Sequence, residues 1–189
     1  MEGLRERKRA HSRAATVDAA MGLFAERGYE HVTVADICAA AEIAPRTFFR
    51  YFPAKEDVLA EPAREMSARV GASIAGAPAG LGDDEAVAGA LRELAGYVLA
   101  HQEQLVLLRR VANGSAAVRA SPFLHLAGRE RDLAEQLLRR RGEQAPADWH
   151  TRLVVARSVA AFRVWLDDVM AGEVPGDPLA HLDEVLAAG

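Results

Sequence analysis

The chain has 189 residues, half of them apolar, and a formal net charge of −4. A chain of this length can bury a sizeable core and form one or two small domains. The acidic balance excludes a general polyanion-binding protein, so any binding to nucleic acid must come from a local patch of positive charge.

The sequence also carries signs of its cellular compartment. A single cysteine, Cys38, excludes an internal disulfide and fits a reducing cytosol. No apolar run approaches the roughly 20 residues that a membrane-spanning helix needs. Met1 is followed by charged residues rather than by the apolar stretch of a signal peptide. We therefore expect a cytoplasmic protein without a membrane partner.

The first predicted helix covers about residues 5–27, with Val17, Ala20, Met21 and Phe24 as its buried stripe and Gly28 as its stop. Its start is rich in basic residues. Such an arm can follow a phosphate backbone or enter a minor groove, and the alternative is a frayed, solvated terminus. The arm residues that we consider for DNA contact are Arg5, Arg7, Lys8 and Arg9.

Residues 33–57, TVADICAAAEIAPRTFFRYFPAKED, contain two short amphipathic segments joined by a tight break. Thr33 and Asp36 have the spacing of an N-terminal cap, and apolar residues then recur at three- and four-residue steps. Pro45 is suited to the first position of the second helix. Phe48 and Phe52 are four residues apart, so both rings are expected in a shared core.

This layout predicts a helix-turn-helix that docks on DNA. The face of the second helix opposite the two rings is expected to hold Arg46, Thr47, Arg50 and Tyr51. Two arginines, a hydroxyl and a phenol on a rigid exposed face suit a helix laid in a major groove. Lys55 stands at the start of the following helix, where its ammonium could meet a phosphate.

Residues 13–60 resemble the DNA-binding domain of the TetR/AcrR family of bacterial transcriptional regulators. The resemblance rests on AATVDAAMGLFAERGYEHVTV, on the T-x-x-D-I opening of the second helix, on P-R-T-F-F-R-Y-F and on P-x-K-E-D. It implies that Pro45, Arg46, Thr47, Phe49, Arg50 and Tyr51 touch base edges or backbone, and that Thr33 and Lys55 touch phosphate. Three positions depart from the family pattern, because Glu42 replaces a glycine of the turn and Ala44 and Ala54 each replace a capping serine.

The rest of the chain is also predicted to be helical, which makes the fold class all-α with about nine helices. Further helices are expected over residues 55–73, from Asp83 or Asp84 to 112 with a break at 101–103, from 121 to 141, over 147–171, and from Asp177-Pro178 onward. We divide the chain into an N-terminal three-helix DNA-binding domain, residues 1–54, and a C-terminal helical bundle for ligand binding and dimerisation, residues 55–189.

Residues 147–171 carry apolar side chains over more of the helix circumference than one core-facing stripe requires. A second buried face implies a partner, and a four-helix homodimer interface with the last helix would supply it. The alternative is a central helix surrounded by its own chain. The residues that we place at the interface are Val154, Ala161, Leu182 and Leu186.

An apolar pocket with a few polar tips is the usual form of a small-molecule site. The candidates for such a pocket in the C-terminal bundle are Tyr97, His101, Phe123, Phe162 and Trp165, although core packing explains each of them separately. The resemblance implies that a pocket exists for an effector of unknown identity.

The sequence shows no catalytic or metal-binding pattern, so we expect neither an enzyme nor a cofactor. The expected function is a dimeric, ligand-responsive transcriptional regulator, more often a repressor, that leaves a palindromic operator when its effector binds. Two alternatives remain. A DNA-binding architectural protein would have a filled bundle, and a helical enzyme would have convergent titratable groups in a cleft.

Overall fold

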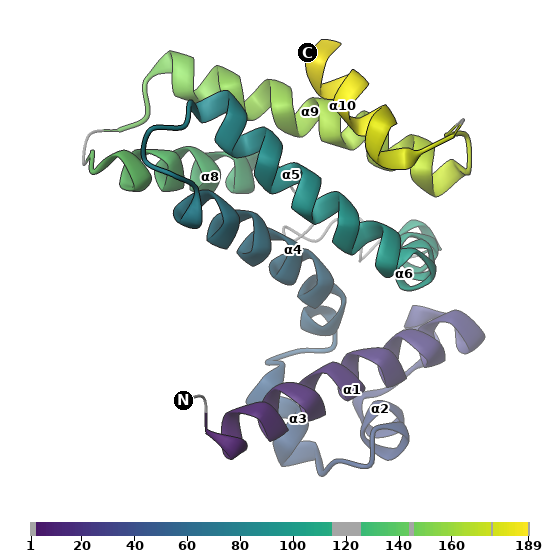
Figure 1. Ribbon diagram of the computed structural model, residues 1–189. Helices are drawn as coiled ribbons and strands as arrows, with labels where there is room; N and C mark the ends of the chain where they lie inside the picture. The colour runs from purple at the N-terminus through teal and green to yellow at the C-terminus, as the bar shows by residue number, and fades with distance from the viewer. Residues whose placement is uncertain (1–2, 115–125, 144–145, 175, 189) are drawn as a thin grey trace. The chain divides into compact units, whose positions relative to one another are not determined.

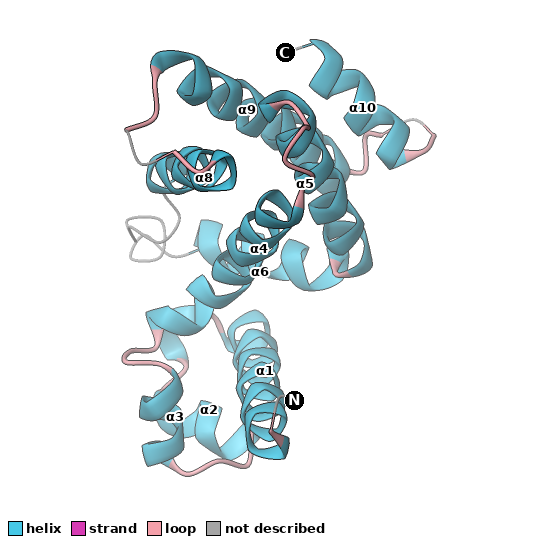
Figure 2. Ribbon diagram, turned by 60° about the vertical axis from the view of Figure 1, so that its left-hand side comes forward, coloured by secondary structure: helices cyan, strands magenta, loops and turns pink. Residues whose placement is uncertain are grey.

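A computed structural model describes residues 3–114, 126–143, 146–174 and 176–188 (Figure 1). Throughout these residues the regular structure is helical and contains no strand, as Figure 2 shows, and this confirms the all-α prediction. None of the helices in the described segments is long and apolar enough to cross a membrane.

The chain forms two compact units. The first contains residues 1–63 and 103–124, and the second contains residues 64–102 and 125–189. The division falls inside α4 and assigns α6 to the first unit, so it differs from the functional boundary that we predict after residue 54. Within the first unit, a hydrogen bond of 2.6 Å from Gln104 to the Asp18 carboxylate joins α6 to α1.

The first unit begins with α1 (Leu4–Arg27), η1 (Tyr29–His31), α2 (Val34–Ala40) and α3 (Pro45–Tyr51). The predicted stripe of α1 is buried, with Ala20, Met21 and Phe24 at most 2% exposed. Gly28 ends α1 with a φ of 80°, a conformation that glycine adopts without a steric cost. Cys38 is buried on α2, where it packs as the predicted small core residue.

The remaining helices are α4 (Glu56–Gly76), α5 (Asp83–Ala100), α6 (Gln102–Gly114), α8 (Leu126–Arg141), α9 (Trp149–Ala171) and α10 (Pro178–Ala188). The predicted break after Ala100 is confirmed. The predicted caps of α5 are wrong, because Gly82 holds the cap position and Asp83 is already helical. The predicted helix start at residues 121–122 lies outside the described residues.

In the second unit, α9 is the central helix, since it packs against α5, α8 and α10. Its side chains Val155 and Trp165 are fully buried, and the Trp165 indole donates to the Pro178 carbonyl at 2.7 Å. Around Val155 and Trp165, α9 is therefore a central helix surrounded by its own chain, which is the alternative to a dimer interface that the sequence left open.

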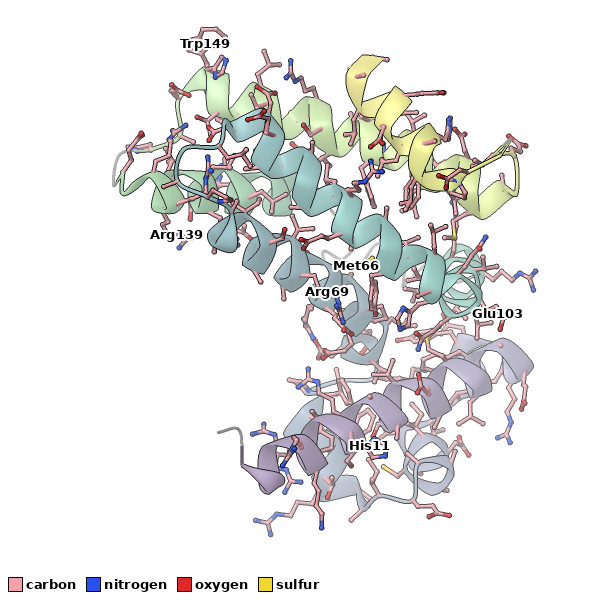
Figure 3. The ribbon with its side chains drawn as sticks, in the orientation of Figure 1. His11, Met66, Arg69, Glu103, Arg139 and Trp149 are labelled. Atoms are coloured by element: carbon pink, nitrogen blue, oxygen red, sulfur yellow. The ribbon has the colours of Figure 1, made fainter. Side chains whose placement is uncertain are left out.

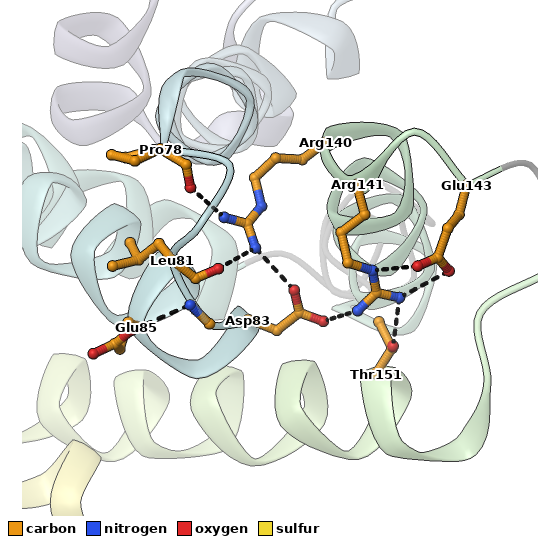
Figure 4. Close-up of polar contacts among 9 residues, drawn as sticks. Pro78, Leu81, Asp83, Glu85, Arg140, Arg141, Glu143 and Thr151 are labelled. Carbon is orange, nitrogen blue, oxygen red and sulfur yellow. Dashed lines mark hydrogen bonds and ion pairs between the residues drawn. The ribbon is translucent and has the colours of Figure 1, made fainter.

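A buried network of ion pairs and hydrogen bonds joins the start of α5 to the end of α8 in the second unit (Figure 4). The Arg140 guanidinium donates to the Asp83 carboxylate at 3.0 Å and to the carbonyls of Pro78 and Leu81 at 3.0 and 2.8 Å. Arg141 pairs with the same carboxylate and with Glu143. Asp83 stands in the first turn of α5 and the arginines in the last turn of α8, so both helix dipoles favour these charges.

Candidate DNA-binding interface and effector cavity

The start of α2 is fixed by a reciprocal cap. The Asp36 N–H donates to the Thr33 hydroxyl oxygen at 3.2 Å, and the Thr33 N–H donates to the Asp36 carboxylate at 2.8 Å. The first contact confirms the predicted cap, and the second completes a capping box. Hydrogen bonds from the Thr33 hydroxyl and N–H also lower the pKa of Asp36. Thr33 is exposed, so its position permits the predicted phosphate contact.

The turn between α2 and α3 has the geometry of a Schellman motif. The Ile43 N–H donates to the Cys38 carbonyl at 3.0 Å, and the Glu42 N–H donates to the Ala39 carbonyl at 3.3 Å. Glu42 holds the left-handed position with a φ of 52°, and it is the one residue other than glycine with positive φ in the described part of the chain. Where the family pattern has glycine, this chain therefore has a glutamate in a conformation that glycine adopts with the least strain.

The recognition helix α3 is anchored by two aromatic side chains. Phe48 and Phe52 are fully buried, with their ring centroids 5.5 Å apart, as the four-residue spacing predicts. Ala44 precedes Pro45 without a side-chain cap. Arg46 and Arg50 are exposed, and Thr47 is half-buried.

Phe49 leaves 55% of its surface exposed beside these polar side chains. Its ring packs edge-on against Phe48 with a centroid separation of 5.5 Å, which limits its motion. An exposed ring held in this way can contact the methyl group of a thymine in a major groove.

Tyr51 does not lie on the exposed face of α3, and this part of our prediction is wrong. Its side chain is only 6% exposed, because position 51 is one helical turn beyond Phe48 and falls beside the buried stripe. Hydrogen bonds with Ser12 and with the Arg50 guanidinium lower the pKa of Tyr51. The phenol oxygen accepts from Arg50 at 3.4 Å, so Tyr51 is placed to orient the Arg50 side chain.

Lys55 is already engaged inside the protein. Its ammonium donates to the carbonyls of Tyr29 and Val32 at 2.8 and 2.9 Å and lies 4.0 Å from the centre of the Tyr29 ring. Two of its three donors thus tie the start of α4 to η1 and to Val32, the residue that follows η1. A phosphate contact by Lys55 stays a prediction, and it would have to share an ammonium that has two carbonyl partners.

The basic N-terminal residues are the first turns of α1 rather than an extended or frayed arm. Arg7, Lys8 and Arg9 are exposed, while the side chain of Arg5 is outside the described part. Farther along α1, the Arg13 guanidinium pairs with both oxygens of Glu61 at 2.7 and 2.6 Å. This bidentate pair joins α1 to the beginning of α4.

The second unit contains a cavity of about 320 Å³ between α4, α5, α8 and α9. Apolar side chains make most of its wall: Met66, Ala68, Val70, Leu91, Leu94, Leu133, Val159, Phe162 and Leu166. Its polar lining residues are Ser67, Asp132, Gln136 and Arg163. Figure 3 shows Met66 on α4, which contributes one side of this wall.

Of the four predicted pocket residues that the structure describes, only Phe162 lines this cavity. Trp165 is wholly buried against α10, because its indole reaches Pro178. Tyr97 and His101 stack on each other at 4.1 Å, and Arg69 covers the Tyr97 ring. Phe123 lies outside the described residues. The helix periodicity identifies apolar residues, but it does not distinguish a filled core from a cavity wall.

Comparison with known proteins identifies the helix-turn-helix. Residues 17–61 match the family described as bacterial regulatory proteins, tetR family. Over 168 residues the chain is 32% identical to the HTH-type transcriptional regulator TcmR of Streptomyces glaucescens, a match that covers 86% of this chain and 74% of TcmR. The chain belongs to the TetR family. It is therefore a DNA-binding transcriptional regulator.

Solved structures of bacterial regulators share the fold. The fatty acid degradation regulator FadR from Bacillus halodurans is 21% identical, with 93% of each chain covered and a TM-score of 0.61. FadR from Thermus thermophilus, a TetR-family transcriptional repressor in complex with lauroyl-CoA, is 25% identical, with 93% of this chain and 91% of that chain covered and a TM-score of 0.53.

The TetR-family bundle leaves an apolar strip of α9 exposed, although not the one that we predict. Val154, Ala161 and Leu182 are buried inside the unit, so they do not reach a partner, and Leu186 is half-buried. The exposed apolar side chains are instead Trp149, Leu153 and Val164, which are 69%, 54% and 50% exposed. Trp149 projects outward from the start of α9 in Figure 3.

Proposed function

We propose that this TetR-family regulator is a repressor that leaves its operator when a small molecule occupies the cavity of the second unit. The observation that carries the proposal is the presence, in one chain, of an exposed arginine-bearing α3 and a separate, largely apolar cavity. DNA and a small molecule therefore have different surfaces to bind.

The proposed DNA contacts come mainly from α3. Arg46 and Arg50 are long, charged and exposed, which suits hydrogen bonding to guanine edges, and Phe49 supplies the apolar contact. Pro45, Thr47 and Thr33 lie at or near helix starts, where they support contacts to the phosphate backbone. The exposed basic side chains at the start of α1 add a contact that carries no sequence information.

The proposed effector response passes through α4. This helix supplies Met66, Ser67 and Val70 to the cavity wall, and its beginning is tied to η1 by Lys55 and to α1 by Glu61. A ligand that favours one position of α4 would change the spacing of the recognition helices and so lower operator affinity. Thermus thermophilus FadR, a repressor with the same fold, has been solved in complex with lauroyl-CoA. This complex supports the proposal that a small molecule binds here.

The proposed oligomer is a homodimer that uses the exposed strip of α9. Trp149, Leu153 and Val164 follow one another at intervals of helical turns, and an apolar strip of this kind is costly to leave in water. A two-fold dimer would place the recognition helices about 34 to 36 Å apart, or a multiple of that, on a palindromic operator.

The cavity favours this function over an architectural DNA-binding protein, for which we expect a filled bundle. A helical enzyme would need convergent titratable groups. Within the part of the cavity wall that the structure describes, the ionisable groups are Asp132 and Arg163, and both are exposed.

Selection of bound fragments from the source genome, with purified protein at one stated salt concentration, tests the proposal. We expect a palindrome with a half-site spacing near one helical turn or a multiple of it. Small molecules are then screened for release of the selected fragment. Binding without preference for any duplex would contradict the proposed operator, and an operator that no compound releases would contradict the effector response.

Arg46→Ala provides the residue-level test. It should weaken operator binding by about 1 to 3 kcal/mol and relax the sequence preference at one position of each half-site. The control is Arg152→Ala, which removes an exposed arginine from α9. Equal effects of the two variants on the sequence preference would show that Arg46 does not read a base.

A further inference from the structure

Gln136 on α8 has an unusual position in the cavity wall. Its side chain packs directly against the backbone of Gly71 on α4: a Cβ atom at residue 71 would lie 2.7 Å from Nε2 and 2.9 Å from Cδ of Gln136, and closer still to Oε1. Such separations are below van der Waals contact, so only glycine at position 71 admits the amide where it stands.

The Gln136 amide is also available to a ligand. It lines the cavity, and none of the hydrogen bonds between described residues uses it. An amide has two donors and a carbonyl acceptor, so it can bind either a donor or an acceptor group of a small molecule. An amide in an apolar wall costs free energy when a ligand displaces its water and makes no hydrogen bond to it. A ligand that hydrogen-bonds to the amide is therefore favoured.

The remaining polar groups indicate the charge of the ligand. Among the described lining residues, the charged side chains are Asp132 and Arg163, which have opposite charges and are both exposed, so these residues together offer no net charge to an ionic ligand. The rest of the wall is almost entirely apolar. Burial of an ion against such a wall would cost free energy that no matched counter-charge returns.

We propose, on the basis of the proposed function, that the effector is a neutral, mainly apolar molecule with at least one hydrogen-bonding group, and that Gln136 binds this group. Gly71 is the positioning residue of Gln136, since it permits the amide to rest on α4. A ligand bound to Gln136 thereby engages a side chain that rests on Gly71 of α4, the helix that the proposed response requires to move.

Two fluorescent probes test the ligand class. N-phenyl-naphthylamine is neutral and has one N–H donor, while anilinonaphthalene sulfonate has the same rings and adds an anionic group. The neutral probe should bind the full-length protein about tenfold more tightly than the sulfonate. Equal or tighter binding of the sulfonate, or no binding of the neutral probe, would overturn the assignment of a neutral ligand.

Gln136→Leu tests the role of the amide, because leucine keeps a side chain of similar size without its polar atoms. We expect the neutral probe to bind about fivefold more weakly to this variant. Thermal unfolding measured on the same samples separates this loss from a loss of fold. A folded Gln136→Leu protein that binds the probe as tightly as the natural chain would overturn the role of Gln136.

A double-mutant cycle tests the dependence on Gly71. Gly71→Ala should weaken probe binding by displacing the amide, but it should have no further effect in a Gln136→Ala background, where the space is free. Gly96→Ala is the matched control, since an added Cβ at this exposed position of α5 meets no atom within 4 Å. Additive effects of the two changes, or equal effects of Gly71→Ala and Gly96→Ala, would contradict the positioning role.

Operator binding by the same preparations separates this inference from the proposed function. A protein that selects an operator but fails the probe cycle would reject the role of Gln136 alone. A protein that passes the probe cycle but selects no operator would reject the proposed function and leave the ligand assignment standing.

Discussion

The helix-turn-helix and the second unit are held together by contacts of different range. The Thr33–Asp36 cap joins residues three apart, and the Phe48 and Phe52 rings meet within one helical turn. In the second unit, the Arg140–Asp83 pair joins residues 57 apart in the sequence, and the Arg92–Asp183 pair joins residues 91 apart. The DNA-binding surface thus rests on local geometry, whereas the cavity exists only where distant helices meet.

The largest expected effect tests whether two buried rings hold the recognition helix. Phe48→Ala should lower the free energy of unfolding by about 3 to 5 kcal/mol, because the ring is fully buried. Phe49→Ala, at the adjacent exposed position, should change it by no more than about 0.5 kcal/mol while reducing operator affinity. Urea denaturation and operator titration measure the two effects, and equal losses of stability would refute the division between anchor and contact.

A second pair of neighbours tests the long-range network of the second unit. Asp83→Ala leaves the Arg140 guanidinium buried without its carboxylate and should cost about 3 to 5 kcal/mol of stability. Asp84→Ala removes the exposed pair with Arg157 and should cost about 0 to 1 kcal/mol. Both residues stand in the first turn of α5, so the helix dipole affects them alike. Similar unfolding curves for the two variants would mean that the buried network adds nothing.

Lys55 makes a long-range contact within the first unit, because its carbonyl partners Tyr29 and Val32 lie more than 20 residues away in the sequence. Lys55→Met leaves the carbonyls of Tyr29 and Val32 without their charged donor, and it should lower the free energy of unfolding by about 1.5 to 3 kcal/mol. A lysine that contacted only phosphate would leave stability unchanged and reduce the salt dependence of operator binding by about one ion. Chemical denaturation without DNA, followed by operator titration at several salt concentrations, distinguishes the two roles.

The smallest expected effect concerns the turn before α3. Glu42→Gly should raise stability by about 1 kcal/mol, because glycine adopts the left-handed conformation without steric strain. Glu93→Gly in the middle of α5 is the control and should lower stability by about 1 kcal/mol. Thermal unfolding of both variants measures the opposite signs, and a loss of stability in Glu42→Gly would indicate that the glutamate side chain makes a compensating contact.

Short-range patterns account for the predictions that the structure confirms. The stop of α1 at Gly28, the Thr33–Asp36 cap and the burial of Phe48 and Phe52 each depend on residues within about one helical turn. The prediction for Tyr51 is wrong because a residue three positions from a buried ring lies at the border between the buried and the exposed face of the helix. Helical periodicity alone does not determine whether a residue at this border is buried. The contact between the Tyr51 phenol and Ser12 on α1 determines it here.

The order and type of the helices, the position of the recognition helix and its exposed arginines follow from the residues alone, because caps, turns and helical periods act between neighbours in the chain. The cavity wall, the Gly71–Gln136 contact, the engagement of Lys55 and the exposed strip of α9 follow from the packing of helices whose residues are far apart in the sequence. Many apolar residues are interchangeable in a periodic pattern. Their separation into core, cavity wall and exposed surface arises only when the helices pack together.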